Sequence, residues 1–304
     1  MRGRLTRRDM LRLSGGTLAG AAVLGLAGCG GGGSGSSGNA SKTLTLGNIG
    51  WAENVAISNL TKVLLEEDLN YQQVQLQTLD LGVLFQGVAG GDLHAFQDVW
   101  MPNNQNYLDQ VGDDVELLDP WYEDQSAYGI AVPDYMDLQS LADLNEAGTN
   151  QITGIEPGAS FHEQIRNEVI PQYNLDMELV ESSTAGMLSE LENKYGSEEP
   201  IVFLGWSPHW MNEEYDFHYL DDPKNAQGSF DEPARLTTIV NADLSEDDPV
   251  AYAFLNAISI NEKEINEIGA EINSSGDEIE GVKTWLEGNR DVVQAWVQAA
   301  KDAQ

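Results

Sequence analysis

Three predicted strands of the chain are each followed closely by a tryptophan, and this pattern constrains the fold more than any other feature. The strands and their tryptophans are residues 43–47 with Trp51, residues 95–99 with Trp100, and residues 201–204 with Trp206. The run at residues 201–204 is wholly apolar, which is typical of a buried strand in a parallel sheet. Because open α/β sheets bind ligands at the carboxyl ends of their strands, we expect the three indoles to meet in one aromatic site.

Tryptophans more often fill a hydrophobic core than bind a ligand, and this alternative applies to each of them. Trp51, Trp100 and Trp206 share a place just beyond a strand and beside glycine or proline, which favours a site. Trp285 and Trp296 lie in amphipathic segments with helical spacing, so we expect these two to face the core.

Predicted strands alternate with predicted helices along the chain. Strands are expected at residues 43–47, 74–79, 95–99, 127–132, 151–155, 177–181, 201–204 and 236–240, and helices at 84–89, 160–169, 184–195, 249–258, 262–272 and 280–300, with a further helix opening at residue 51. This alternation indicates doubly wound α/β lobes. The first lobe is expected to comprise residues 43–132, the second residues 133–234, and the return to the first residues 235–304.

The composition is strongly acidic. Asp and Glu number 50 against 15 Lys and Arg, for a formal net charge of -35. Such a chain repels nucleic acid and anionic membrane surfaces, so we expect neither as a partner. The acidic residues are spread through apolar-containing segments rather than gathered in a disordered tail. We infer a folded protein adapted to strong charge screening at high salt, with an ordinary acidic secreted protein as the alternative.

The amino-terminal residues 1–28 have the features of an export signal rather than of a folded domain. Arg7 and Arg8 form a twin-arginine pattern ahead of an apolar, glycine-rich stretch that is too short for a convincing membrane span. The sequence around Cys29 resembles a lipoprotein processing box, which predicts a lipid anchor on the outer face of the cytoplasmic membrane. Residues 29–42 are glycine- and serine-rich and predict a flexible tether. Because Cys29 is the single cysteine, an intramolecular disulfide is excluded.

A cluster of indoles has a specific chemical use. The face of an indole ring carries negative potential and attracts a cation that has no hydrogen-bond donors, as in quaternary ammonium ligands. Each desolvated contact of this kind is worth up to about 2 kcal/mol. Binding a permanent cation in this way also avoids the desolvation cost of a buried ion pair.

Six segments carry a resemblance to a known family. They are NIGWAENVA (residues 48–56), DVWMPN (98–103), ITGIEPG (152–158), VESSTAGML (180–188), GWSPHWM (205–211) and YDFHYLDDPK (215–224). In their order and spacing the chain resembles the glycine betaine-binding proteins of osmoprotectant ABC importers. The resemblance implies a periplasmic-binding-protein-like fold of type II, with the ligand between two lobes of mainly parallel sheet. It also implies a binding protein without enzymatic activity, cofactor or metal, whose partners are an ABC permease and its ATPase.

The resemblance assigns ligand-binding roles to particular residues. By motif position, Trp51, Trp100 and Trp206 surround the trimethylammonium group of the ligand. The backbone N–H groups of Gly154 and Ile155 are expected to hold the ligand carboxylate, near a helix N-terminus that suits an anion.

Other residues near these motifs have supporting or alternative assignments. Gln105 stands where the family often has a histidine, and its neutral amide is expected to donate to the carboxylate without the charge of an imidazolium. This change leaves open whether betaine is preferred over choline or another methylated amine. His209 and Trp210 are expected to support the site. For Glu53 and Asp98, capping or solvated carboxylates are as reasonable as ligand contacts.

Two alternatives from other classes remain. Aromatic clefts with carboxylates also bind sugars, so a secreted carbohydrate-active hydrolase is the rival. No nucleophile elbow occurs in the folded part, and the four histidines show no metal-ligand spacing. A sensory or scaffold protein on the same fold is the third option.

Overall fold

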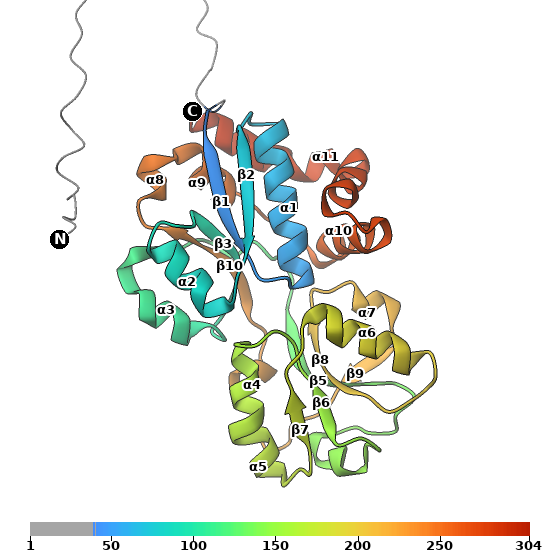
Figure 1. The fold of residues 1–304 in the computed structure, drawn as a ribbon. Coiled ribbons are helices and arrows are strands. Elements are labelled where there is room, and N and C mark those ends of the chain that lie inside the picture. Colours follow the sequence, from blue (N-terminus) through green and yellow to red (C-terminus); the bar gives the residue numbers. More distant parts are fainter. Residues whose placement is uncertain (1–38, 40) are drawn as a thin grey trace, which may run out of the picture. The chain divides into compact units, whose positions relative to one another are not determined.

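The computed structural model describes residue 39 and residues 41–304 of the chain. The predicted export signal, Cys29 and most of the predicted tether lie outside the described residues. Two α/β lobes are present, each built on its own five-stranded sheet (Figure 1). This confirms the predicted fold class of two α/β lobes, and each sheet is mixed, with two parallel and two antiparallel pairings.

Lobe 1 is built on a sheet in the strand order β2-β1-β3-β10-β4. Its strands are β1 (Thr43–Asn48), β2 (Gln73–Thr78), β3 (Ala95–Met101), β4 (Val115–Leu117) and β10 (Arg235–Asn241). β1 pairs in parallel with β2 and β3, whereas β10 is antiparallel to β3 and β4. The chain therefore returns to lobe 1 directly beside β3, the strand that carries Trp100.

The helices of lobe 1 come from both ends of the described chain. They are α1 (Ala52–Glu67), α2 (Leu81–Ala89), α3 (Gln105–Val111), the single turn η1 (Gly112–Asp114), α8 (Leu244–Asp247), α9 (Pro249–Asn256), α10 (Glu262–Ser275) and α11 (Glu278–Asp302). Figure 1 shows α1 beside α10 and α11, and these three helices contact one another. Trp285 and Trp296 of α11 are buried, which confirms their predicted place in the core.

The α10–α11 hairpin has clear local causes. Asn261 and Glu264 form a reciprocal capping box at the start of α10. Gly276 ends the helix with φ 69°, a left-handed conformation that glycine adopts without strain. Gly281 of α11 lies so close to α10 that an added Cβ would fall 2.5 Å from the backbone nitrogen of Ile272. The two helices therefore pack closely before α11 continues along α1 and α9.

Lobe 2 is built on a sheet in the order β7-β6-β8-β5-β9. Its strands are β5 (Ala127–Pro133), β6 (Gln151–Thr153), β7 (Glu178–Val180), β8 (Val202–Ser207) and β9 (Phe217–Tyr219). Its helical segments are η2 (Leu141–Glu146), α4 (Ser160–Gln164), the π-helical η3 (Ile165–Val169), α5 (Ile170–Tyr173), α6 (Thr184–Tyr195), α7 (Met211–Glu214) and η4 (Gly228–Asp231). α4, η3 and α5 follow one another without a break. Ser160 is the first residue of α4 rather than its cap, because Ala159 occupies the N-cap position.

Strand pairing changes the expected boundary between the lobes. Residues 127–132 were expected to end lobe 1, but β5 pairs antiparallel with β8 and β9 and so belongs to lobe 2. The chain crosses to lobe 2 within residues 118–126 and returns within residues 220–234. An apolar run predicts a strand, but its periodicity does not tell which sheet the strand joins.

The two crossing segments are joined to each other. The Ser126 hydroxyl donates to the Ala234 carbonyl over 3.0 Å and accepts from the Ala234 amide over 2.8 Å. Ser126 is buried, so these hydrogen bonds are shielded from water. Any rotation of one lobe against the other must therefore bend these two linked segments.

Candidate functional site

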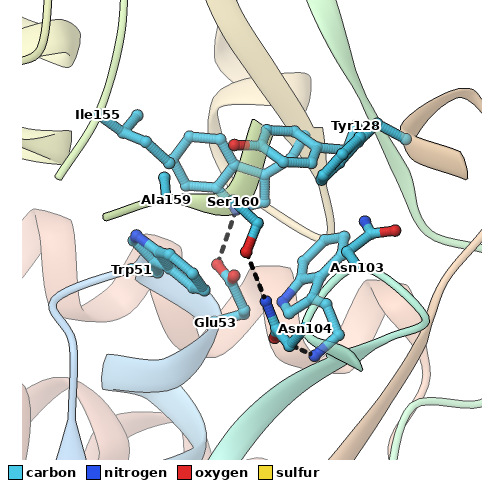
Figure 2. Close-up of a pocket in the computed structure, with 11 residues that line it drawn as sticks. Trp51, Glu53, Asn103, Asn104, Tyr128, Ile155, Ala159 and Ser160 are labelled. Atoms are coloured by element: carbon cyan, nitrogen blue, oxygen red, sulfur yellow. Dashed lines mark hydrogen bonds between the residues drawn. The ribbon is translucent and has the colours of Figure 1, made fainter. Parts of the chain in front are cut away.

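One cavity is lined by residues of both lobes. Its lining residues are Trp51, Glu53, Trp100, Asn103 and Asn104 from lobe 1, Tyr128, Ile155, Ala159, Ser160 and Trp206 from lobe 2, and Phe230 from the returning segment (Figure 2). The space among these residues, open solvent included, is about 350 Å³. The three tryptophans expected to meet in one site therefore do line one cavity.

The positions of these indoles differ in detail from the pattern expected. Trp51 is the N-cap residue of α1, but Trp100 and Trp206 lie within the last residues of β3 and β8 rather than beyond them. Gly205 does not end its strand. A Cβ at Gly205 would lie 3.2 Å from atoms of Ala131, Phe217 and Tyr219, so the glycine allows close packing inside the sheet.

Two of the indoles reach across the cavity to carboxylates of the opposite lobe. Trp51 of lobe 1 donates from Nε1 to Glu156 of lobe 2 over 3.1 Å. Trp206 of lobe 2 donates from Nε1 to Glu53 of lobe 1 over 2.8 Å. Because each N–H lies at the edge of its ring, these bonds restrain the ring orientation without using the π face.

Glu156 is itself fixed by the beginning of α6. Its carboxylate accepts from the Thr184 amide over 2.7 Å and from the Thr184 hydroxyl over 2.8 Å. The first turn of a helix favours a negative group in this way. The orientation of Trp51 therefore depends on a helix of the other lobe.

The third indole is held within its own strand. Trp100 Nε1 donates to Asp98 Oδ1 over 2.8 Å. Asp98 is fully buried and Glu53 is 3% exposed. Burial raises the pKa of Glu53 to about 8, and burial together with the nearby Glu53 raises the pKa of Asp98 well above its usual value. The two acids are therefore not solvated, and Glu53, in the first turn of α1, lines the cavity itself.

Tyr128 is an aromatic lining residue that the sequence analysis did not identify. Its ring lies 6.0 Å from that of Trp100 with an interplanar angle of 55°. In the antiparallel pairing of β5 with β8, Tyr128 is directly opposite Trp206, which places both on one side of the sheet. Only this register identifies Tyr128 as a lining residue, and the register can be inferred only if β5 is already assigned to lobe 2. Asn104, Ser160 and Phe230 are further lining residues outside the quoted motifs, and Asn103 ends the motif DVWMPN without having been assigned a role.

The two backbone amides expected to hold a carboxylate have partners within the protein. The Gly154 amide donates to the Val180 carbonyl over 2.8 Å, and the Ile155 amide donates to His162 Nε2 over 3.3 Å. Only Ile155 lines the cavity. Burial lowers the pKa of His162 to about 4, so the imidazole is neutral and its Nε2 is a hydrogen-bond acceptor. A carboxylate that binds the Ile155 amide must replace His162 there.

Gln105 lies outside the cavity lining. Its side-chain amide donates to Asp109 over 2.7 Å at the surface of α3. None of the lining residues is Lys, Arg or His, whereas one of them is a carboxylic acid. Besides Glu53 and the phenol of Tyr128, the polar lining side chains are Asn103, Asn104 and Ser160, and the last two share a hydrogen bond of 3.4 Å.

His209 and Trp210 support the cavity from behind without lining it. The His209 ring packs against Trp206 at 4.6 Å, nearly perpendicular, and its Nδ1 accepts from the Met211 amide over 2.9 Å. Burial lowers the pKa of His209 to about 3, so this imidazole is neutral. A Cβ at Gly269 of α10 would lie 3.2 Å from the Trp210 ring, so this glycine lets lobe 2 pack closely on lobe 1.

The same loop of lobe 2 makes two polar contacts with α10. Ser207 donates a hydrogen bond to Glu262, and Asn266 donates to Glu213 over 3.4 Å. Together with Trp210 and Gly269, these residues form a contact that we call the α10 latch.

Two α/β lobes that share one aromatic cavity define a two-lobed substrate-binding protein. Residues 42–288 match the family model described as the substrate binding domain of the ABC-type glycine betaine transport system. The chain belongs to this family, whose members are transporter binding proteins.

Particular relatives support this assignment. A glycine betaine/carnitine transport binding protein of Listeria monocytogenes is 37% identical over 162 residues, which cover 52% of this chain and about half (53%) of that protein. The solved lactococcal OpuAC, in a closed conformation with glycine betaine, is 31% identical, with a TM-score of 0.76 over 84% of this chain and 100% of that one. A choline binding protein in an unliganded semi-closed conformation is 26% identical, with a TM-score of 0.72 over 84% of this chain and 91% of that one.

Two further properties concern the described part of the chain. Across residues 39 and 41–304, no helix has both the length and the apolar character that a membrane crossing requires. The same residues contain no group of three or more His, Cys, Asp or Glu side chains placed to hold a metal ion.

Proposed function

We propose that this protein is the substrate-binding subunit of an ABC importer and captures glycine betaine or a related quaternary ammonium solute for osmoprotection. The observation that carries the proposal is the convergence of Trp51, Trp100 and Trp206, from both lobes, on one cavity without a basic lining residue. Cation–π attraction to the three ring faces, with Tyr128 as a fourth aromatic neighbour, supplies the binding energy. The family and the glycine betaine complex of the lactococcal relative support the ligand class.

The polar end of the ligand is proposed to face Asn103, Asn104, Ser160 and the Ile155 amide. For a carboxylate, the Ile155 N–H exchanges its bond to His162 for one to the ligand. Gln105 is left out of this set because its side chain bonds to Asp109 outside the cavity.

Ligand binding is proposed to favour the closed arrangement of the lobes. The cavity takes lining residues from both lobes, so a ligand touches all of them only when the lobes are together. The closed form is then presented to a permease and its ATPase. The sequence further supports twin-arginine export and a lipid anchor at Cys29 on the outer face of the cytoplasmic membrane.

Calorimetric titration with glycine betaine, proline betaine, choline and carnitine at high salt tests the proposal. Saturable binding of at least one of these solutes, without turnover, is the expected result. Absence of binding together with hydrolysis of a chromogenic glycoside would instead support the hydrolase alternative, which the family assignment weighs against.

Replacement of one indole tests the box itself. Trp206→Ala should weaken binding about 30-fold, the equivalent of about 2 kcal/mol. Trp285→Phe is the matched control, because Trp285 is a buried residue of α11 that does not line the cavity, and it should leave the dissociation constant unchanged. An unaltered dissociation constant in a folded Trp206→Ala protein would exclude Trp206 from the ligand site.

A further inference from the structure

Glu53 and Asp98 form a buried pair of carboxyl groups against the tryptophan cavity. One oxygen of each accepts an indole N–H, from Trp206 and Trp100, over 2.8 Å in both cases. The remaining oxygens, Glu53 Oε1 and Asp98 Oδ2, have no donor partner among the described residues. The two carboxyl groups are near enough to influence each other, because Glu53 helps to raise the pKa of Asp98. Two ionised carboxylates buried together without a cation repel each other, so we infer that at least one of the pair is protonated.

The surroundings supply no positive charge to offset a second negative one. The acid of the opposite lobe that faces this pair is Glu156, and no lining residue is basic. His209, behind Trp206, is neutral at physiological pH. Burial and nearby acids, Glu53 among them, raise the pKa of the phenol of Tyr128, which is therefore neutral as well. The same holds for the Tyr122 hydroxyl, whose pKa is also raised by burial and by Glu262, Asp124 and Glu53.

The positions of the two acids give them different roles. Glu53 lines the cavity, whereas Asp98 lies behind it on β3 and does not. A cation in the cavity therefore meets Glu53 first, and Asp98 acts on the site only through Glu53 and Trp100.

We propose, on the basis of the proposed function, that Glu53 loses its proton when a quaternary ammonium cation enters the cavity. Asp98 keeps its proton and acts as a positioning residue that donates a hydrogen bond to Glu53. In that step the O–H bond of Glu53 breaks, its electron pair stays on the carboxylate, and the proton passes to the buffer. The ligand cation and the Glu53 anion then neutralise each other, while the bond from Asp98 and the bond from Trp206 hold the anion in place.

The direction of the pKa shifts agrees with this assignment. With a pKa of about 8, Glu53 is mostly protonated at pH 7 in the empty site, and the pKa of Asp98 is also raised well above its usual value by burial and by Glu53. A neighbouring cation lowers the pKa of a carboxyl group. Ligand affinity should therefore rise with pH, by up to about tenfold per pH unit between pH 6 and 8, and level off above pH 8.

Calorimetry in two buffers tests the proton release. Choline chloride and glycine betaine are titrated into the protein at pH 7, at one salt concentration, in phosphate and in Tris, whose ionisation enthalpies differ. The enthalpy difference should correspond to release of about one proton per ligand bound. Equal enthalpies in the two buffers, with an affinity that is flat from pH 6 to 9, would overturn the proposal while leaving the proposed function intact. Absence of any binding would instead remove the proposed function.

Variants separate the two acids. Glu53→Gln keeps an acceptor for Trp206 and should abolish both the proton release and the pH dependence. Asp98→Asn imitates the protonated acid, so affinity should stay within about threefold of wild type with proton release retained, whereas Asp98→Ala should lose at least about tenfold. Glu168→Gln, an exposed acid of lobe 2, is the control and should change neither quantity.

Near-ultraviolet circular dichroism checks that each variant is folded. The two-buffer calorimetry of the wild-type protein tests the proposal even if a variant does not fold. An Asp98→Asn protein that binds as poorly as Asp98→Ala would show that Asp98 acts as an anion, which contradicts the assignment.

Discussion

Trp51 of lobe 1 donates its indole N–H to Glu156 of lobe 2, across the cavity, over 3.1 Å. The reverse arrangement occurs on the other side, where Trp206 of lobe 2 donates to Glu53 of lobe 1. Each lobe thus supplies an indole to the cavity and a carboxyl group that orients the indole of its partner lobe. The aromatic cavity is complete only when both lobes are in place, so the proposed ligand capture requires the lobes to be together.

Removal of the Glu156 carboxylate should weaken ligand binding without a direct contact to the ligand. Glu156→Ala removes the acceptor of the Trp51 indole N–H and of the Thr184 amide, so the Trp51 ring is no longer held to lobe 2. We expect calorimetry to show about a tenfold rise in the dissociation constant of the ligand. Glu156→Gln keeps an oxygen acceptor and should lose less. Glu163→Gln, on the exposed side of α4, is the matched control. A Glu156→Ala protein with wild-type affinity would show that the cross-lobe bond does not matter for binding.

The α10 latch should also set the affinity from outside the cavity. Gly269→Leu places a side chain where the Trp210 ring now lies. The resulting overpacking should destabilise the closed arrangement of the lobes by about 1–3 kcal/mol. We expect the dissociation constant to rise about tenfold.

The control for this change is another helical glycine. Nothing lies within 4 Å of a Cβ added to Gly288 of α11, so Gly288→Ala should leave affinity unchanged. If Gly269→Leu binds as tightly as Gly288→Ala, the latch contact is not part of the closed state that binds ligand.

The buried Glu53 should make folding stability depend on pH. Its pKa is about 8 in the folded chain against 4.5 for a free carboxyl group, so between these values the folded chain holds a proton that the unfolded chain releases. The contribution of Glu53 to the free energy of unfolding is therefore present below about pH 4.5 and is lost as the pH rises toward 8. Guanidinium unfolding at pH 5, 6, 7 and 8 should show wild type losing stability relative to Glu53→Gln. A difference that stays constant with pH would mean that Glu53 is ionised in the folded protein.

Gln105 provides a test of the motif-based assignment. Because its side chain bonds to Asp109 away from the cavity, Gln105→Ala should leave the dissociation constants of glycine betaine and choline within about twofold of wild type. A selective loss of glycine betaine affinity would restore Gln105 as a carboxylate ligand and would require α3 to move on binding.

The three tryptophans of the cavity could be predicted from the sequence. Trp51, Trp100 and Trp206 lie at or just after predicted strands, and strand ends of α/β sheets converge where ligands bind. Most strands and the long helices were also expected close to their observed bounds, with α6 at residues 184–195 as the clearest case. These features depend on local pattern, which a sequence shows directly.

The remainder depends on pairing between distant segments. Tyr128 lines the cavity because β5 joins lobe 2 in register with β8, and no periodicity reveals that choice of sheet. The roles of Glu53, Asp98 and Glu156 were hidden for another reason. In a chain with 50 acidic residues, an acid next to a tryptophan carries little information until the structure shows which acids are buried.

The most direct test compares choline with 3,3-dimethylbutan-1-ol, a neutral molecule of nearly the same shape in which carbon replaces the ammonium nitrogen. If the indole faces recognise a fixed positive charge, the neutral molecule should bind at least about 30-fold more weakly than choline in calorimetric titration at the same salt concentration. Equal dissociation constants for the two molecules would contradict recognition of charge and leave only an apolar cavity that accepts a tert-butyl-sized group.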